Sequence, residues 1–153
     1  MERCTDKDFG LSMEVPTSWA DDSNDTYYVI FYARPEKNYR SNVGFQKLGT
    51  RLGDEAALRM FTEKYKEKLS REHYQYKAVD EQWFTQAEKP AYLHRFEWQD
   101  PEMDVAFCAL HAFLYASPSN VYEMKCLTIK PLLNDHLPIF EHILKSIRFV
   151  KRA

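Results

Sequence analysis

Strand-like sequence runs almost without interruption from His73 to Ile129, and only short turn sequences break it. β-Branched and aromatic residues dominate these runs, whereas Pro, Asn, Asp and Ser cluster between them. Connections this short join neighbouring strands that run in opposite directions. The pattern therefore predicts consecutive β-hairpins in an antiparallel sheet. The predicted strands of this block span His73–Phe84, Ala91–Trp98, Met103–Ala116 and Val121–Ile129.

The rest of the chain supplies shorter strands and two helices. Strands are predicted at Phe9–Val15, Thr26–Ala33 and Ser41–Leu48. After Asp54 the apolar residues recur at intervals of three and four, which is typical of an amphipathic helix with Asp54 as its N-cap. A second helix is predicted from about Leu137 to Ser146. The sequence thus predicts an α+β fold, an antiparallel sheet of about six to seven strands packed with two main helices, in a single domain over residues 1–153.

Composition excludes several classes of protein. Only four glycines accompany 10 Phe, 10 Tyr and 3 Trp, which disfavours glycine-lined phosphate or dinucleotide loops. A net charge of −2, with acidic and basic residues interleaved, supplies little of the attraction that nucleic-acid binding needs. No stretch approaches the roughly 20 apolar residues of a membrane-spanning helix. We therefore expect neither nucleic-acid binding nor membrane insertion.

No catalytic or metal-binding motif is present in the sequence. The five histidines are scattered and form no H-E-x-x-H pattern. Cys108 and His111 are three residues apart, which places them on opposite faces of a strand. Cys108 and Cys126 lie in apolar strands, where buried and unreactive thiols are usual. We expect a protein that is not an enzyme and that has no metal site and no cofactor.

The beginning of the chain and its cysteines indicate a compartment. The first eight residues are charged and lack the apolar core of a secretory signal. Three cysteines are an odd number, and none forms a C-x-x-C pair. Both features suit a reducing environment, so we expect a cytoplasmic location.

Aromatic residues gather on one face of the predicted sheet. Alternate residues of a strand point to opposite faces, and the run from Met103 to Tyr115 has large side chains at its odd positions and mostly smaller ones at its even positions. The strand from Ala91 to Trp98 repeats this pattern with aromatic residues and histidine on one side. Its other side carries Leu93, Arg95 and Glu97.

Two explanations of the aromatic face remain open. The second helix could cover this face, which would make its residues ordinary core. Alternatively, the face is a surface that receives a peptide or an apolar helix, or lines a pocket for a small molecule. On the surface interpretation, the partner-binding residues are Tyr28, Tyr32, Tyr92, Phe96, Trp98, Phe107 and His111.

The order of these elements resembles the PsbP-like α+β family, which includes DcrB-type proteins and Mog-type Ran-binding proteins. The resemblance rests on Phe9-Gly-Leu-Ser-Met-Glu-Val-Pro16 followed by Trp19, on the early helix and long antiparallel strands, and on the closing Ile139–Phe149 segment. Within the family, the chain is most similar to small cytoplasmic DcrB-type chaperones of the Eag kind. That similarity implies a homodimer that shields apolar segments of a secreted effector in type VI secretion. The Mog-type members imply, as an alternative, a regulator of a small GTPase.

Overall fold

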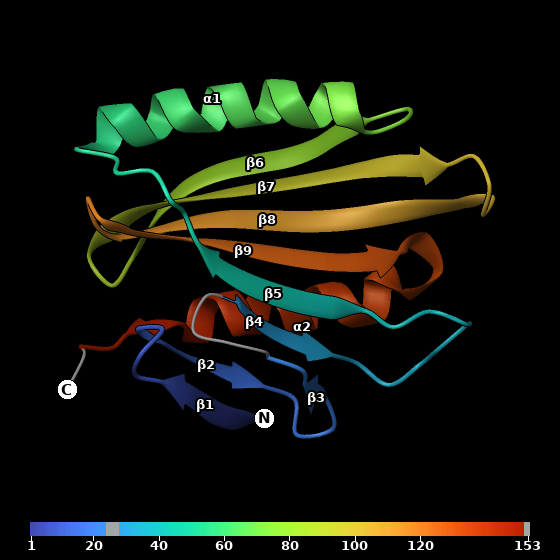
Figure 1. The fold of residues 1–153 in the computed structure, drawn as a ribbon. Helices are drawn as coiled ribbons and strands as arrows, with labels where there is room; N and C mark the ends of the chain where they lie inside the picture. The colour runs from blue at the N-terminus through green and yellow to red at the C-terminus, as the bar shows by residue number, and fades with distance from the viewer. Residues whose placement is uncertain (24–27, 152–153) are drawn as a thin grey trace.

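A seven-stranded antiparallel sheet, in the order β3-β4-β5-β9-β8-β7-β6, forms the centre of the fold (Figure 1). A second sheet of three strands, in the order β1-β2-β10, lies beside it. The computed structural model describes residues 1–23 and 28–151. In chain order the elements are β1 (Glu2–Asp6), β2 (Leu11–Val15), β3 (Ala20–Asp21), β4 (Tyr28–Tyr32), β5 (Asn42–Lys47), α1 (Glu55–Glu72), β6 (Lys77–Gln86), β7 (Lys89–Asp100), β8 (Val105–Ser117), β9 (Asn120–Ile129), the 3-10 turn η1 (Lys130–Leu132), α2 (Leu133–Ser146) and β10 (Arg148–Phe149).

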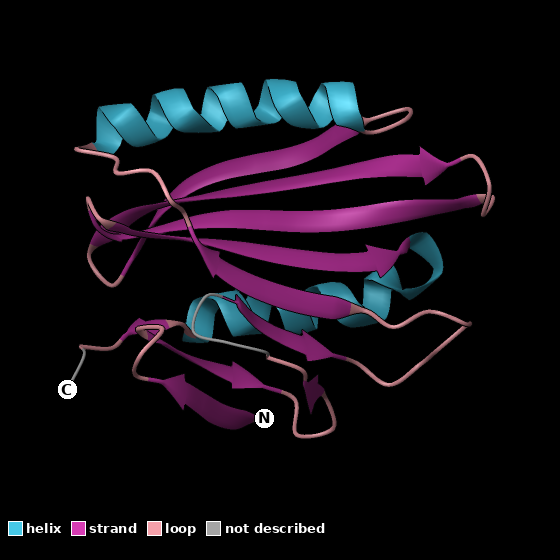
Figure 2. Cartoon of the chain, in the orientation of Figure 1, coloured by secondary structure: helices cyan, strands magenta, loops and turns pink. Residues whose placement is uncertain are grey.

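This architecture confirms the predicted α+β class, with a large antiparallel sheet and two main helices (Figure 2). The predicted strand at 26–33 corresponds to β4, although residues 26 and 27 lie outside the described residues. The prediction missed β1, β3 and β10. Glu2–Asp6 is charged and has no alternation of apolar residues, so its pairing with β2 decides its conformation.

Helix α1 begins where the sequence predicts. The Asp54 side chain accepts a hydrogen bond from the backbone N–H of Ala57 at 2.8 Å, which is the N-cap arrangement. The helix ends at His73, whose backbone N–H bonds to the carbonyl of Leu69. His73 was predicted to begin a strand, but this helix cap delays β6 to Lys77.

Helix α2 begins at Leu133, four residues before the predicted start at Leu137. The 3-10 turn η1 leads directly into it, and Pro138 lies inside the helix. Proline has no N–H to donate to the carbonyl four residues earlier, which is that of Asn134. Because Asn134 is exposed, water can bond to that carbonyl, and the helix continues through Pro138.

The two helices pack on opposite faces of the large sheet. Helix α2 and the small sheet cover one face through a core that includes Leu110, Leu114, Phe140 and Ile143. Helix α1 lies on the other face, and in Figure 1 it runs along the β6–β7 side of the sheet. Among the described residues, no helix is long and apolar enough to cross a membrane.

Packing under α1 should dominate the stability of that side of the molecule. Phe113 is fully buried there, in contact with Phe61 and Tyr65 of α1. We predict that Phe113→Ala lowers the free energy of unfolding by about 3–5 kcal/mol, because it leaves a cavity in the core. Urea denaturation measures this change.

Met60 provides a matched control on the outer surface of α1, where it is 65% exposed. Met60→Ala should change the free energy of unfolding by no more than about 0.5 kcal/mol. Equal losses for the two variants would contradict the packing of α1 described above.

Candidate functional site

The strand register brings the seven predicted partner-binding residues to one face of the large sheet. Across the strands, Tyr28 lies opposite Gln46, Gln46 opposite Glu123, Glu123 opposite Phe113, and Phe113 opposite Tyr92. A parallel row of the same face reads Tyr32, Asn42, Leu127, Ala109 and Phe96. The prediction that the aromatic residues share a face is therefore confirmed.

Helix α1 covers the β7 and β8 part of this face. Tyr92 and Phe96 are each only 1% exposed. Tyr65 of α1 packs edge-on against Phe113, with ring centroids 4.9 Å apart, and Leu69 packs with Phe96 and Ala109. The expectation of an open aromatic face is therefore wrong for Tyr92 and Phe96. The covering helix is α1, not the second helix, because the apolar stripe of α1 is the surface that meets these rings.

Trp98 and Phe107 stack on each other beyond the end of α1, with ring centroids 5.3 Å apart. The His73 ring lies edge-on to Trp98 at 4.6 Å, and Tyr39 lies edge-on to Phe107 at 5.9 Å. Phe107 is buried, whereas Trp98 is half-buried. This pair closes one end of the aromatic face, and of its two rings only that of Trp98 is partly exposed to solvent.

Tyr28 and Tyr32 lie on the part of the face that α1 does not cover. Both are half-buried. In Figure 1 no helix lies in front of β9, β5 and β4, whereas α2 lies behind them. We name this surface the β4 face; by register and parity it consists of Tyr28, Ile30, Tyr32, Asn42, Gly44, Gln46, Lys125 and Leu127.

Gly44 determines the shape of the β4 face. A Cβ at this position would lie 3.0 Å from the hydroxyl oxygen of Tyr28 and 3.4 Å from its ring, so the glycine allows the ring to lie over β5. On the neighbouring row, the Arg40 guanidinium lies 4.8 Å from the centre of the Tyr32 ring, in a cation–π contact. The two tyrosines are thus held in place, with their edges available to a partner.

A buried hydrogen-bonded chain separates the β4 face from the region under α1. The hydroxyl of Tyr65 lies 2.5 Å from Nδ1 of His111, and the nearby carboxylate of Glu123 pairs with Lys125 at 3.2 Å. Either group can be the donor in the bond between the Tyr65 hydroxyl and His111 Nδ1, because a neutral imidazole nitrogen donates or accepts according to its tautomer. His111 is therefore a buried link in the structure and does not reach the surface.

Burial changes the protonation of this chain. It holds the pKa of His111 well below its usual range, and the charge of Lys125 acts in the same direction. Burial also raises the pKa of the Tyr65 hydroxyl, with a further contribution from Glu123. Both groups therefore stay neutral at physiological pH.

Ser41, His136 and Glu36 come together in an arrangement that the sequence analysis missed. Ser41 Oγ lies 2.5 Å from Nδ1 of His136 and 2.7 Å from the hydroxyl of Thr128, while His136 Nε2 lies 3.5 Å from a Glu36 oxygen. Serine, histidine and a carboxylate are the components of a hydrolytic triad. Ser41, however, is 0% exposed and already shares its hydroxyl between two partners. This cluster therefore ties α2 to the sheet and leaves no room for a substrate at Oγ.

The cysteine in the centre of β8 is unreactive in this setting. Burial raises the pKa of the Cys108 thiol to about 12, and the nearby Glu97 carboxylate adds to the effect. The thiol consequently stays protonated and is a poor nucleophile. Within residues 1–23 and 28–151, no group of three or more His, Cys, Asp or Glu residues could hold a metal ion.

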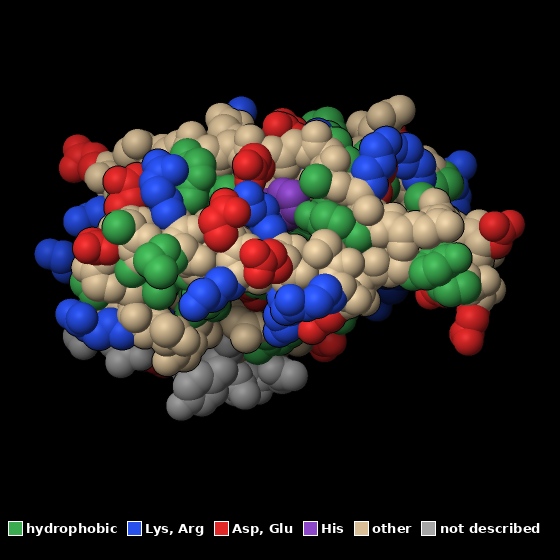
Figure 3. Space-filling model, turned by 90° about the horizontal axis from the view of Figure 1, so that it is seen from above, with side chains coloured by type: hydrophobic (Ala, Val, Ile, Leu, Met, Phe, Trp, Pro, Cys, Tyr) green, Lys and Arg blue, Asp and Glu red, His purple; other side chains and the backbone are tan. Residues whose placement is uncertain are grey.

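The outer surface around α1 mixes charges of both signs. Seen from above, Lys and Arg side chains alternate with Asp and Glu, and hydrophobic side chains occur in small groups (Figure 3). On α1 itself, Lys66 pairs with Glu63 at 2.8 Å and Lys68 pairs with Glu72 at 3.9 Å. This view therefore shows no basic stripe of the kind that tracks a phosphate backbone.

The buried histidine makes stability depend on pH. Below about pH 6.5 the unfolded chain protonates this side chain, whereas the folded chain does not. The unfolded state then binds more protons, so the free energy of unfolding falls as the pH drops below that value. We predict that the free energy of unfolding of His111→Gln falls less steeply with decreasing pH than that of the wild type, by up to about 1.4 kcal/mol per pH unit. Urea denaturation from pH 7.5 to 5 measures the difference.

His142 offers the control, because its side chain is 46% exposed. His142→Gln should follow the pH dependence of the wild type more closely than His111→Gln does. If His111→Gln and the wild type lose the same stability over this pH range, the burial of a neutral His111 is contradicted.

Comparison with known proteins identifies solved structures that share this fold. No protein-family model matches the sequence, and no curated protein matches it. Among solved structures, cyanobacterial PsbP from Synechocystis has a TM-score of 0.66 at 13% identity, over 97% of this chain and 91% of that one. The Saccharomyces cerevisiae Ran-binding protein Mog1p has a TM-score of 0.64 at 9% identity, over 98% and 95%. A Pseudomonas aeruginosa protein of unknown function has a TM-score of 0.64 at 16% identity, over 88% of both chains. The chain therefore has the α+β fold of PsbP and Mog1p, as the sequence resemblance implies.

Proposed function

We propose that this protein is a non-enzymatic protein-binding module whose β4 face receives an apolar segment of a partner protein. The observation that carries the proposal is the incomplete cover of the aromatic sheet face. Helix α1 packs over β7 and β8, whereas Tyr28 and Tyr32 on β4 stay half-buried. Half-buried tyrosines combine apolar contact area with a polar edge, which is typical of protein interfaces.

The chemistry of the β4 face suits an apolar helix that carries a few polar groups. The rings of Tyr28 and Tyr32, together with Leu127, offer apolar area. Asn42 lies between Tyr32 and Leu127, and Gln46 lies beside Tyr28, so their amides can bond to polar groups of the partner. Trp98, which lies on β7 at one end of the aromatic face, would extend the contact.

The more specific form of the proposal is a cytoplasmic chaperone or adaptor that shields apolar segments of a secreted effector in type VI secretion, acting as a homodimer. It is supported by the sequence resemblance to DcrB-type chaperones of the Eag kind. In this form, the partner does not contact Tyr92, Phe96 and His111. These buried residues hold α1 against the sheet beside the β4 face.

A second candidate function is regulation of a small GTPase. It is favoured by the fold shared with Mog1p, which is named a Ran-binding protein. Failure to accelerate nucleotide release from a small GTPase would end this candidate. A small-molecule site lined by the aromatic face is less well supported, because the rings on β7 and β8 pack against α1.

Co-expression with an apolar helix tests the main proposal. The probe is a soluble carrier protein fused to a helix of Leu and Ala with lysines at both ends. We predict that the wild-type protein co-purifies with the probe, and that Tyr32→Asp reduces the amount recovered at least about tenfold, because a bound partner would bury the new charge.

The control is Met60→Asp, which places the same charge on the exposed side of α1. It should leave recovery unchanged, and thermal unfolding of each variant establishes that it folds. Equal recovery with Tyr32→Asp and the wild type would overturn the assignment of the β4 face.

A further inference from the structure

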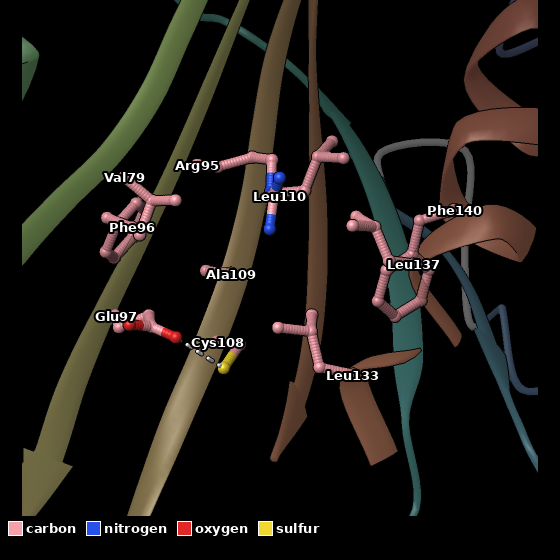
Figure 4. A pocket seen from close by; sticks show the side chains of 10 residues that line it. All are labelled: Val79, Arg95, Phe96, Glu97, Cys108, Ala109, Leu110, Leu133, Leu137 and Phe140. Carbon is pink, nitrogen blue, oxygen red and sulfur yellow. Dashed lines mark hydrogen bonds between the residues drawn. The ribbon is translucent and has the colours of Figure 1, made fainter. Parts of the chain in front are cut away.

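A groove runs along α2 on the opposite face of the sheet. One wall is α2 and the other is formed by β7 with the neighbouring parts of β6 and β8 (Figure 4). We name it the α2 groove; its lining includes Phe84, Leu93, Arg95, Leu137, Glu141 and Leu144. Its wider part is a hollow of about 360 Å³, and Arg95 also lines a narrow slot beside Leu133 and Cys108.

The hollow has an apolar floor. Phe84 and Leu93 are half-buried on the strands, and Leu144 is buried on the facing side of α2. Its volume falls at the lower end of the range of small-molecule sites, roughly 300–1,000 Å³. The remaining lining residues are polar or charged, so the hollow suits an amphiphilic ligand whose apolar chain lies on Phe84, Leu93 and Leu144.

Arg95 is the one residue that lines both the hollow and the slot. It lies opposite Leu110 in the register of β7 and β8, and Figure 4 shows its guanidinium directed towards Leu110, on the side of the sheet where α2 lies. The side chain is half-buried. Among the described residues, its guanidinium has no hydrogen-bond acceptor within 3.5 Å and no carboxylate within 4.0 Å.

The neighbouring acidic groups do not neutralise Arg95. Glu97 is bonded to Lys130 and Cys108. Asp80 lies opposite Arg95 in the register, next to the bulge at Val79, but forms no ion pair with it within 4.0 Å. A half-buried guanidinium has five N–H donors in a fork that matches a carboxylate. Asp80 and Glu141 also line the hollow, but no carboxylate of the described residues lies within 4.0 Å of the Arg95 guanidinium.

We propose that the α2 groove binds an amphiphilic carboxylate, with the carboxylate on Arg95 and the apolar chain along Phe84, Leu93 and Leu144. This site lies on the other side of the sheet from the β4 face, so it does not depend on the protein-binding function proposed above. The ligand class follows from the unpaired guanidinium and from the size of the hollow.

Titration with sodium decanoate, followed by the methyl NMR signals of Leu93 and Leu144, tests the proposal. We expect decanoate to shift these signals, and Arg95→Gln to weaken its binding at least about tenfold, because a charge-assisted bond is lost. Asp80→Asn should strengthen binding, since it removes a like charge beside the ligand. Arg95→Lys keeps the charge and should retain part of the affinity.

1-Decanol is the matched probe, because it has the same chain without the carboxylate. It should bind more weakly than decanoate, and Arg95→Gln should not change its affinity. The proposal is overturned if decanoate binds the wild type and Arg95→Gln equally, if decanol binds as tightly as decanoate, or if decanoate shifts signals on the β4 face instead. Absence of decanoate binding to the wild type would also overturn it, while leaving the test of the β4 face unaffected.

Discussion

The packing of α1 on the aromatic rings of β7 and β8 decides which surfaces this molecule can offer. The apolar stripe of α1 buries Tyr92, Phe96 and Phe113, so the richest aromatic region of the sequence is core. Because the helix runs over the β6–β7 side, no helix covers the same sheet face on β4 and β5. The available binding surface is therefore what α1 leaves open, at Tyr28 and Tyr32.

The two faces of the sheet are specialised in different ways. On the α1 side, aromatic rings pack under the helix, and a buried hydrogen bond between His111 and Tyr65 lies between these rings and the β4 face. On the α2 side, smaller apolar residues allow α2 to approach, and a groove remains where Arg95 has no partner among the described residues. Each proposed site thus lies where a helix covers only part of a sheet face, so a partner would complete the layer.

Much of this fold could be predicted from local patterns. The alternation between Met103 and Tyr115 correctly separated an aromatic face from a face of smaller residues, since that separation depends only on strand geometry. The pattern could not tell which helix covers the aromatic face, because both helices carry an apolar stripe. The contact between Ser41 and His136 was missed for a related reason: the two residues are 95 positions apart, and only the tertiary fold brings them together.

If the β4 face is the binding surface, Tyr28 and Tyr32 receive a partner while α1 stays in place over Tyr92 and Phe96. The most direct test compares capture of an apolar helix by the free chain and by a chain whose α1 is covalently tied to the sheet by an engineered disulfide. Equal capture is expected under oxidising and reducing conditions. Capture that is lost on oxidation and restored on reduction would show that α1 must move away to expose the buried rings, and that the β4 face is not the binding surface.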